Sequence, residues 1–112
     1  MSQGLTGNRY AKSLMGLATE KNVLDAVYAD MELIASTIKD SDDLELLLKS
    51  PVVKTDKKQA IMTAVFGGKT SDLTNLFLNL ISNRKREAII KDIAVSFIDL
   101  YKRSKNIVIA EV

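Results

Sequence analysis

The sequence predicts an all-α protein, a single compact six-helix bundle followed by a short extended C-terminal tail. Apolar residues recur every three or four positions over most of the chain, the spacing that gathers them on one face of a helix. Strict alternation, which is typical of a strand, occurs only at the end of the chain. With 112 residues, 46% of them hydrophobic, the chain is long enough to bury a core of its own. The expected domain spans residues 1–105, and residues 106–112 are expected to be a linker.

The first two helices are predicted over about residues 6–20 and 22–39. The first opens at Thr6 or Asn8. The second carries apolar residues at positions i, i+3, i+4 and i+7 of one face, while its opposite face is polar. We therefore expect the second helix to lie on the outside of the bundle.

Small polar residues mark the starts of the next three helices, near Ser41 or Asp42, at Thr55 or Asp56, and at Ser71 or Asp72. Glu45 and Gln59 each follow one of these starts at the spacing of a capping box. The third helix ends before Pro51, because the residue before a proline is pushed out of the helical region. The fourth ends at Gly67-Gly68, since glycine adopts the left-handed conformation that closes a helix.

The fifth helix is predicted to end at Asn83, and the sixth to span about residues 85–104. The segment from Asn106 to Val112 is rich in β-branched residues, which favour a strand. Since the rest of the chain offers no strand to pair with it, this end is expected to be either a piece cut from a longer protein or a linker.

The composition excludes several classes of chemistry. The chain has no cysteine and no histidine, which rules out disulfide frameworks, thiolate or histidine metal centres and Ser-His-Asp triads. A net charge of +2 is too balanced to indicate a polyanionic partner by itself. The first twenty residues lack the features of a signal peptide, and apolar runs are far shorter than the roughly 20 residues of a membrane span. We expect no direct membrane insertion, no metal and no cofactor.

Two motifs are better explained as helix ends than as ligand sites. Gly68-Lys69-Thr70 resembles the end of a phosphate-binding loop, but Thr63 stands where that motif needs a glycine, and the segment follows a helix rather than a strand. The acidic residues at 40–45 lack the central glycine and final glutamate of a calcium loop. They are expected to be a solvated helix start.

A basic stretch at residues 84–105 supports a second hypothesis, a small helical nucleic-acid-binding domain. Its basic residues are Arg84, Lys85, Arg86, Lys91, Lys102, Arg103 and Lys105. Against this hypothesis, the acidic residues Glu87, Asp92 and Asp99 interrupt the same segment. Exposed aromatic residues are not interleaved with the basic ones either.

The first and fifth predicted helices have wide apolar faces. At 100° per residue these span about 160° and about 200°, against roughly 100° for a helix packed on one side. Either both helices lie centrally in the bundle, or part of this width forms an exposed groove for an amphipathic helix of another protein. In the fifth helix Asn79 and Asn83 form a polar edge beside the leucines. In the first, Ser13 and Gly16 would allow a neighbour to approach closely.

The stretch Arg9-Tyr10-Ala11-Lys12-Ser13-Leu14 resembles the opening helix of the delta subunit of F-type ATP synthases, whose mitochondrial counterpart is the oligomycin-sensitivity-conferring protein. Further similar fragments follow in the same order: Leu48-Lys49-Ser50-Pro51, Lys57-Lys58, Phe66, and Asn75 through Asn83 to Arg84 and Arg86. The resemblance extends over residues 9–101 and covers only the first domain of that family, a six-helix bundle.

The resemblance implies a non-catalytic stator component of the ATP synthase, at the cytoplasmic face of the bacterial plasma membrane. The N-terminal helix of an alpha subunit would lie between the first and fifth helices, and a second domain would bind the b subunits. The isolated domain would be monomeric and bind no nucleic acid. Carried over by position, the groove residues are Tyr10, Ser13, Leu14, Leu17, Leu76, Asn79, Leu80 and Asn83. Ser13 and Asn79 stand where relatives often have small or aliphatic residues, which implies a more polar groove.

Overall fold

The computed structural model describes the backbone of residues 2–110 and the side chains of residues 6–105. This part of the chain forms six α-helices and one 3-10 helix, without a strand. In order these are α1 (Ser2–Glu20), α2 (Leu24–Asp40), α3 (Asp42–Lys49), α4 (Thr55–Phe66), α5 (Asp72–Asn83), η1 (Glu87–Ile89) and α6 (Ile90–Ala110). The all-α, six-helix prediction is confirmed.

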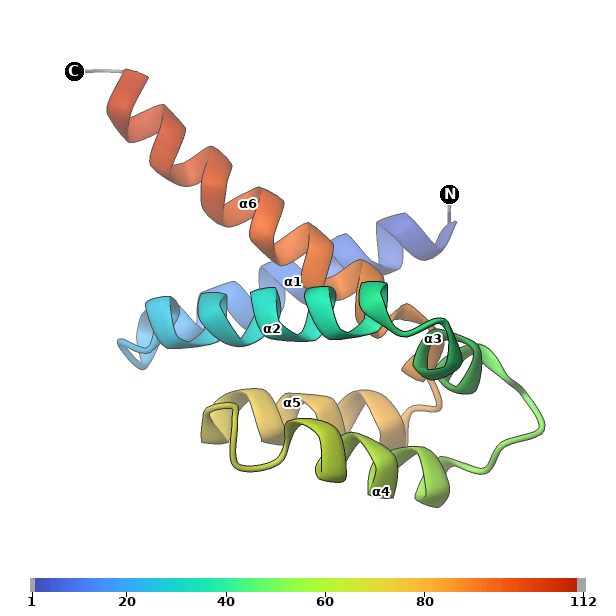
Figure 1. Ribbon diagram of the computed structural model, residues 1–112. Coiled ribbons are helices and arrows are strands. Elements are labelled where there is room, and N and C mark those ends of the chain that lie inside the picture. The colour runs from blue at the N-terminus through green and yellow to red at the C-terminus, as the bar shows by residue number, and fades with distance from the viewer. Residues whose placement is uncertain (1, 111–112) are drawn as a thin grey trace.

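The helices divide into a closed side and an open side. On the closed side α6 packs against both α1 and α2, and its C-terminal half extends beyond the other helices (Figure 1). On the open side α4 and α5 form an antiparallel pair below α2 (Figure 1). The core between these layers contains Leu14, Ile34, Ile81 and Phe97, all of which are fully buried.

Gly7 allows a close contact between α1 and α6 on the closed side. A Cβ added at Gly7 would lie 3.0 Å from the Cβ of Asp92 and 3.3 Å from the backbone nitrogen of Ile93. A larger residue would therefore push α1 away from α6. This packing leaves the opposite face of α1 available to the open side.

Several predicted helix ends are confirmed. The Ser41 hydroxyl accepts a hydrogen bond from the Leu44 N–H at 3.2 Å and so caps α3. Ser50, the residue before Pro51, has left the helical region with ψ of 123°. Gly67 follows the last residue of α4, and Gly68 has a left-handed φ of 80°.

The predicted capping boxes are wrong. Glu45 instead forms ion pairs with Lys49 at 3.0 Å and with Lys91 of α6 at 3.4 Å. The Gln59 amide donates to the Asn83 side-chain carbonyl at 3.2 Å. The reason is the position of the N-caps: they are Ser41 and Lys54, one residue or more before the residues that the two boxes require, so Glu45 and Gln59 do not occupy the third position of their helices.

The C-terminal segment differs from its prediction. α6 begins at Ile90, after η1, and continues to Ala110, so residues 106–110 are helical rather than extended. Extending an existing helix costs little, because a β-branched residue lowers helix propensity by less than about 0.7 kcal/mol, whereas a lone strand has no hydrogen-bond partner. The last two residues of the predicted tail lie outside the described residues. The domain boundary at residue 105 stays a prediction.

Two buried polar contacts fix α5 and α4 in place. Asp30 of α2 accepts hydrogen bonds through one carboxylate oxygen from the Ser71 N–H at 2.9 Å, the Ser71 hydroxyl at 2.7 Å and the Thr74 hydroxyl at 2.7 Å. Ser71 is the residue before the first turn of α5, so a side chain of α2 caps that helix at its positive end. Asp30 therefore fixes the start of α5 relative to α2.

The second contact is a buried ion pair. The Lys58 ammonium of α4 donates to the Leu48 carbonyl at 3.1 Å and lies 3.8 Å from a carboxylate oxygen of Glu87. The two charged side chains are 8% and 3% exposed. This pair joins α3, α4 and η1, so the open side is anchored at both ends of α5.

Candidate protein-binding groove

Leu17 of α1 and several side chains of α5 line an apolar groove between these two helices. The two helices run in opposite directions (Figure 1). The groove encloses about 360 Å³ and is lined by Leu17, Leu73, Leu76, Phe77, Asn79, Leu80 and Asn83. Three of its leucines are strongly exposed, Leu17 at 41%, Leu76 at 67% and Leu80 at 42%. Scattered exposed leucines are ordinary, but a contiguous group with a polar edge is typical of a surface that contacts another protein.

The wide apolar face of each of the two helices has one part in the core and another part in the groove. On α5, Phe77 and Ile81 are buried in the core while Leu76 and Leu80 face the groove. On α1, Leu14 is fully buried, whereas Leu17, three residues further, lines the groove. The excess apolar width seen in the sequence is thus divided between the core and an exposed surface.

The structure brings most of the expected groove residues together. Leu17, Leu76, Asn79, Leu80 and Asn83 line the apolar groove. Tyr10 and Ser13 instead line an adjoining pocket nearer the N-terminus of α1. Leu14 is different, because its side chain is 0% exposed and forms part of the core beneath the groove.

Tyr10 and Phe77 form the connection between α1 and α5. Their ring centroids are 6.2 Å apart and the ring planes meet at 74°, an edge-to-face arrangement. This aromatic contact lies between the apolar groove and the adjoining pocket.

Several lining residues were not among the expected ones. Leu73 and Phe77 line the groove, while Thr6, Arg9, Arg84 and Arg86 line the adjoining pocket. Leu73 lies one turn before Leu76, so helical spacing could have indicated it. The position of Arg86 depends on the turn after α5, which local sequence patterns did not predict.

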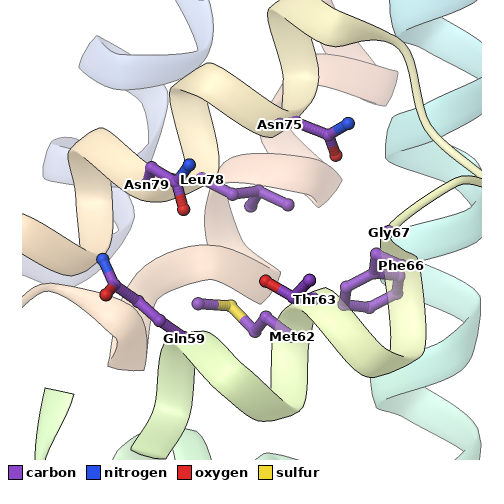
Figure 2. Close-up of a pocket in the computed structure, with 8 residues that line it drawn as sticks. All are labelled: Gln59, Met62, Thr63, Phe66, Gly67, Asn75, Leu78 and Asn79. Atoms are coloured by element: carbon purple, nitrogen blue, oxygen red, sulfur yellow. The ribbon is translucent and has the colours of Figure 1, made fainter. Parts of the chain in front are cut away.

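A second pocket lies between α4 and α5 (Figure 2). It encloses about 200 Å³ and is lined by Gln59, Met62, Thr63, Phe66, Gly67, Asn75, Leu78 and Asn79. No ionisable side chain lines it, and its volume lies below the range of about 300–1,000 Å³ that is usual for small-molecule sites. Asn79 lines both this pocket and the groove, so it forms the ridge between them.

Three of the seven basic residues in the stretch at 84–105 have partners within the fold. Lys91 pairs with Glu45 at 3.4 Å, Arg103 pairs with Asp99 at 3.0 Å, and the Lys105 ammonium lies 5.3 Å from the centre of the Tyr101 ring. Part of the charge expected for nucleic-acid binding is therefore engaged within the fold. Arg84 and Arg86 face the pocket beside Tyr10 instead.

An aromatic pair far from the groove joins α2 to α6. Tyr28 and Tyr101 stack with centroids 3.9 Å apart, and the Tyr101 hydroxyl donates to Asp25 at 2.8 Å. That hydrogen bond, followed by burial, raises the pKa of Tyr101, and burial is the main cause that raises the pKa of Tyr28. Both hydroxyls are therefore neutral near neutral pH, and the pair supports the extended part of α6.

Within residues 2–110, acidic side chains do not gather in a group of three or more able to hold a metal ion. None of the helices described there is long and apolar enough to cross a bilayer. A helical bundle with an open, polar-edged apolar groove is typical of domains that bind a helix of another protein.

Comparison with known proteins identifies the family. The family model for "ATP synthase delta (OSCP) subunit" matches residues 6–112, so the chain belongs to the ATP synthase delta (OSCP) subunit family. It is 42% identical over 112 residues to the ATP synthase subunit delta of Cytophaga hutchinsonii, covering 100% of this chain and 62% of that relative. The corresponding subunit of Chlorobium luteolum is 37% identical over 112 residues, again 100% and 62% of the two chains. That of Parabacteroides distasonis is 35% identical over 107 residues, 96% and 59%.

Proposed function

We propose that this domain belongs to a non-catalytic stator subunit of an F-type ATP synthase and binds the N-terminal helix of an alpha subunit in the α1–α5 groove. The observation that carries the proposal is the group of exposed leucines, Leu17, Leu76 and Leu80, around an open groove. An amphipathic helix recognises such a groove through apolar residues spaced at i, i+3, i+4 and i+7.

The physical task of a stator explains why a groove is sufficient. A rotor turning inside the catalytic head would carry the head with it unless a tight, non-rotating link held the head in place. Burial of apolar surface gives about 25 cal/mol per Å², less the costs of association, and needs no reactive group. A chain without histidine or cysteine is compatible with that task.

The other parts of the proposal follow from the family. The chain spans about 62% of the length of the relatives from Cytophaga hutchinsonii and Chlorobium luteolum, and α6 points away from the bundle (Figure 1). A further domain beyond α6 would bind the b subunits of the peripheral stalk. In that assembly the domain would lie at the cytoplasmic face of the bacterial plasma membrane, peripheral to it, and contribute to proton-driven ATP synthesis.

The binding test uses a synthetic peptide from the alpha subunit's N-terminus, about 20 residues long, which is about 30 Å when helical. Titration into the 112-residue chain is followed by NMR amide shifts. We expect one peptide to bind per monomeric domain, with shifts concentrated on α1 and α5. Shifts confined to α2 and α3 would show that the groove is not the site.

A matched pair of variants separates groove contact from general surface hydrophobicity. Leu76 in the groove and Leu46 on α3 are both 67% exposed. Leu76→Asp should weaken peptide binding roughly tenfold or more, because it places a charge in the apolar contact. Leu46→Asp should leave the affinity unchanged. Equal effects of the two substitutions in calorimetric titrations would contradict the proposed site.

A further inference from the structure

Three arginines converge at one end of the groove. Arg9 of α1, together with Arg84 and Arg86 after α5, lines a pocket of about 380 Å³ that also includes Thr6, Tyr10 and Ser13. All three arginines are exposed. Within residues 6–105 ion pairs with a carboxylate are formed by Lys49, Lys58, Lys91 and Arg103, and by none of these three arginines. What distinguishes the three, which form a basic cluster, is that they line one pocket together.

The backbone holds two of these arginines rigidly. Lys85, between them, has a left-handed φ of 58°. The Lys85 N–H donates to the Ser82 carbonyl at 2.9 Å, and the Arg86 N–H donates to the Ile81 carbonyl at 3.0 Å. These paired bonds are a Schellman motif, a conformation that usually requires glycine. The backbone of Arg84 and Arg86 is thus held at the C-terminal end of α5, with both side chains exposed.

The basic cluster is continuous with the apolar groove. Tyr10 and Ser13 lie one to two turns from Leu17 on α1, and Asn83 of the groove directly precedes Arg84. On α5, Leu76, Leu80 and Arg84 lie at i, i+4 and i+8, on one side of the helix. At 1.5 Å per residue this series is about 12 Å long, a little over two helical turns.

We propose that the occupant of the groove is an amphipathic helix with an acidic turn that binds Arg9, Arg84 and Arg86. This inference rests on the proposed function of the groove and specifies the partner's chemistry. The helix places apolar residues on Leu17, Leu76 and Leu80 and carries one or two carboxylates about two turns from the residue that contacts Leu76. Guanidinium groups bind carboxylates through paired hydrogen bonds, so the cluster fixes the position and direction of the helix along the groove.

The test compares two peptides on two forms of the 112-residue chain. One peptide is the alpha subunit's N-terminal segment, and the other is a copy with its Asp and Glu residues replaced by Asn and Gln. The wild-type chain should bind the amide copy about five- to tenfold more weakly, the effect expected of a small network of exposed ion pairs. Raising salt from about 0.05 M to about 0.5 M should remove most of this difference.

The double variant Arg84→Gln/Arg86→Gln completes a thermodynamic cycle. It should bind the acidic peptide about five- to tenfold more weakly than the wild-type chain does, yet bind the amide copy as well as the wild-type chain does. The control Lys12→Gln/Lys21→Gln removes the same net charge from residues outside both pockets. It should leave both affinities unchanged, and circular dichroism should show that all forms are folded.

The outcomes separate the two proposals. If neither peptide binds the wild-type chain, the proposed function of the groove fails. If both bind and Leu76→Asp abolishes binding, but the arginine variant and the amide copy have no effect, only the acidic-turn inference fails. Tighter binding of a DNA duplex than of the acidic peptide, lost in the arginine variant, would also overturn it, since the cluster would then bind a polyanion.

Discussion

Leu14 and Leu17 are both leucines of α1, three residues apart, yet they belong to different sides of the molecule. Leu14 is 0% exposed and packs in the core of the closed side, while Leu17 is 41% exposed and lines the open groove. The closed side, made by α1, α2 and α6, buries its apolar residues within the chain. On the open side, Leu76 and Leu80 of α5 remain exposed to solvent where that helix forms the groove with α1.

This difference shows that apolar residues have two uses in the same bundle. Residues of the closed side stabilise the domain itself, because folding removes their surface from water. Exposed leucines of the open side contribute little to that stability, and their surface remains available for a partner. Substitutions on the closed side should therefore lower the free energy of unfolding. Substitutions of the exposed leucines on the open side should instead weaken the binding of a partner.

The largest expected effect is a loss of stability from a substitution on the closed side. Leu14→Asp puts a charge into a fully buried site and should lower the free energy of unfolding by about 4 kcal/mol or more. The same change at Leu76, which is 67% exposed, should shift it by no more than about 0.5 kcal/mol. Urea denaturation measures both. Comparable losses of stability would mean that the two sides are not distinct.

A smaller effect is expected where the open side is attached to α2. Asp30→Ala removes the acceptor for three donors at the start of α5 and should cost about 2 kcal/mol. Hydrogen exchange should also become faster at the first turn of α5. Asp30→Asn retains one acceptor oxygen and should lose less. An alanine variant as stable as the wild-type chain would show that α5 is held by packing alone.

Glycine substitutions in two turns should raise the stability of the domain, and by different amounts. Lys85 and Asn22 both have a left-handed φ, 58° and 60°. Lys85→Gly should stabilise the domain by about 0.5–1 kcal/mol, because a long side chain is strained in that conformation. Asn22→Gly should change stability by only a few tenths of a kcal/mol, because asparagine tolerates the left-handed region. Thermal unfolding tests the order, and an equal gain at both positions would contradict it.

The smallest effect concerns the ion pairs that tie α3 to the closed side. The Lys49 hydrogen bond, with further contributions from Lys91, lowers the pKa of Glu45 below its ordinary 4.5. The stabilisation from the ionised Glu45 carboxylate is therefore present above about pH 4.5. It is lost as the pH falls through the lower pKa that Glu45 has in the folded state. The stability difference between the wild-type chain and Glu45→Gln should shrink between about pH 5 and about pH 3. A constant difference over that range would show that the pair is not formed.

Many features of the fold could be predicted because they depend on neighbours in sequence. The helical spacing of apolar residues, the cap at Ser41 and the glycines that end α4 all act over about one helical turn. The wide apolar faces of the first and fifth helices indicated either central burial or a groove. Resemblance to the delta subunit family added which residues to expect there, and most of them line the groove or its adjoining pocket.

Other features depend on contacts between distant residues. Asp30 caps α5 across 41 positions of sequence, and Lys58 meets Glu87 only because α4 lies beside η1. Periodicity placed Leu14 and Leu17 on one apolar face without saying which would be buried. The C-terminal segment was predicted as extended from its β-branched residues, but α6 continues through it to Ala110.

The sequence by itself determined the helices, most of their ends, the absence of cysteine and histidine chemistry, and an apolar surface larger than one packed face of each helix needs. Only the tertiary structure decided which leucines are core and which are groove, and that three arginines gather at one end of it. The physical reason is the separation in sequence over which each interaction acts. Helix formation and capping act over a few residues, whereas burial and charge pairing depend on how helices that are distant in sequence cross in space.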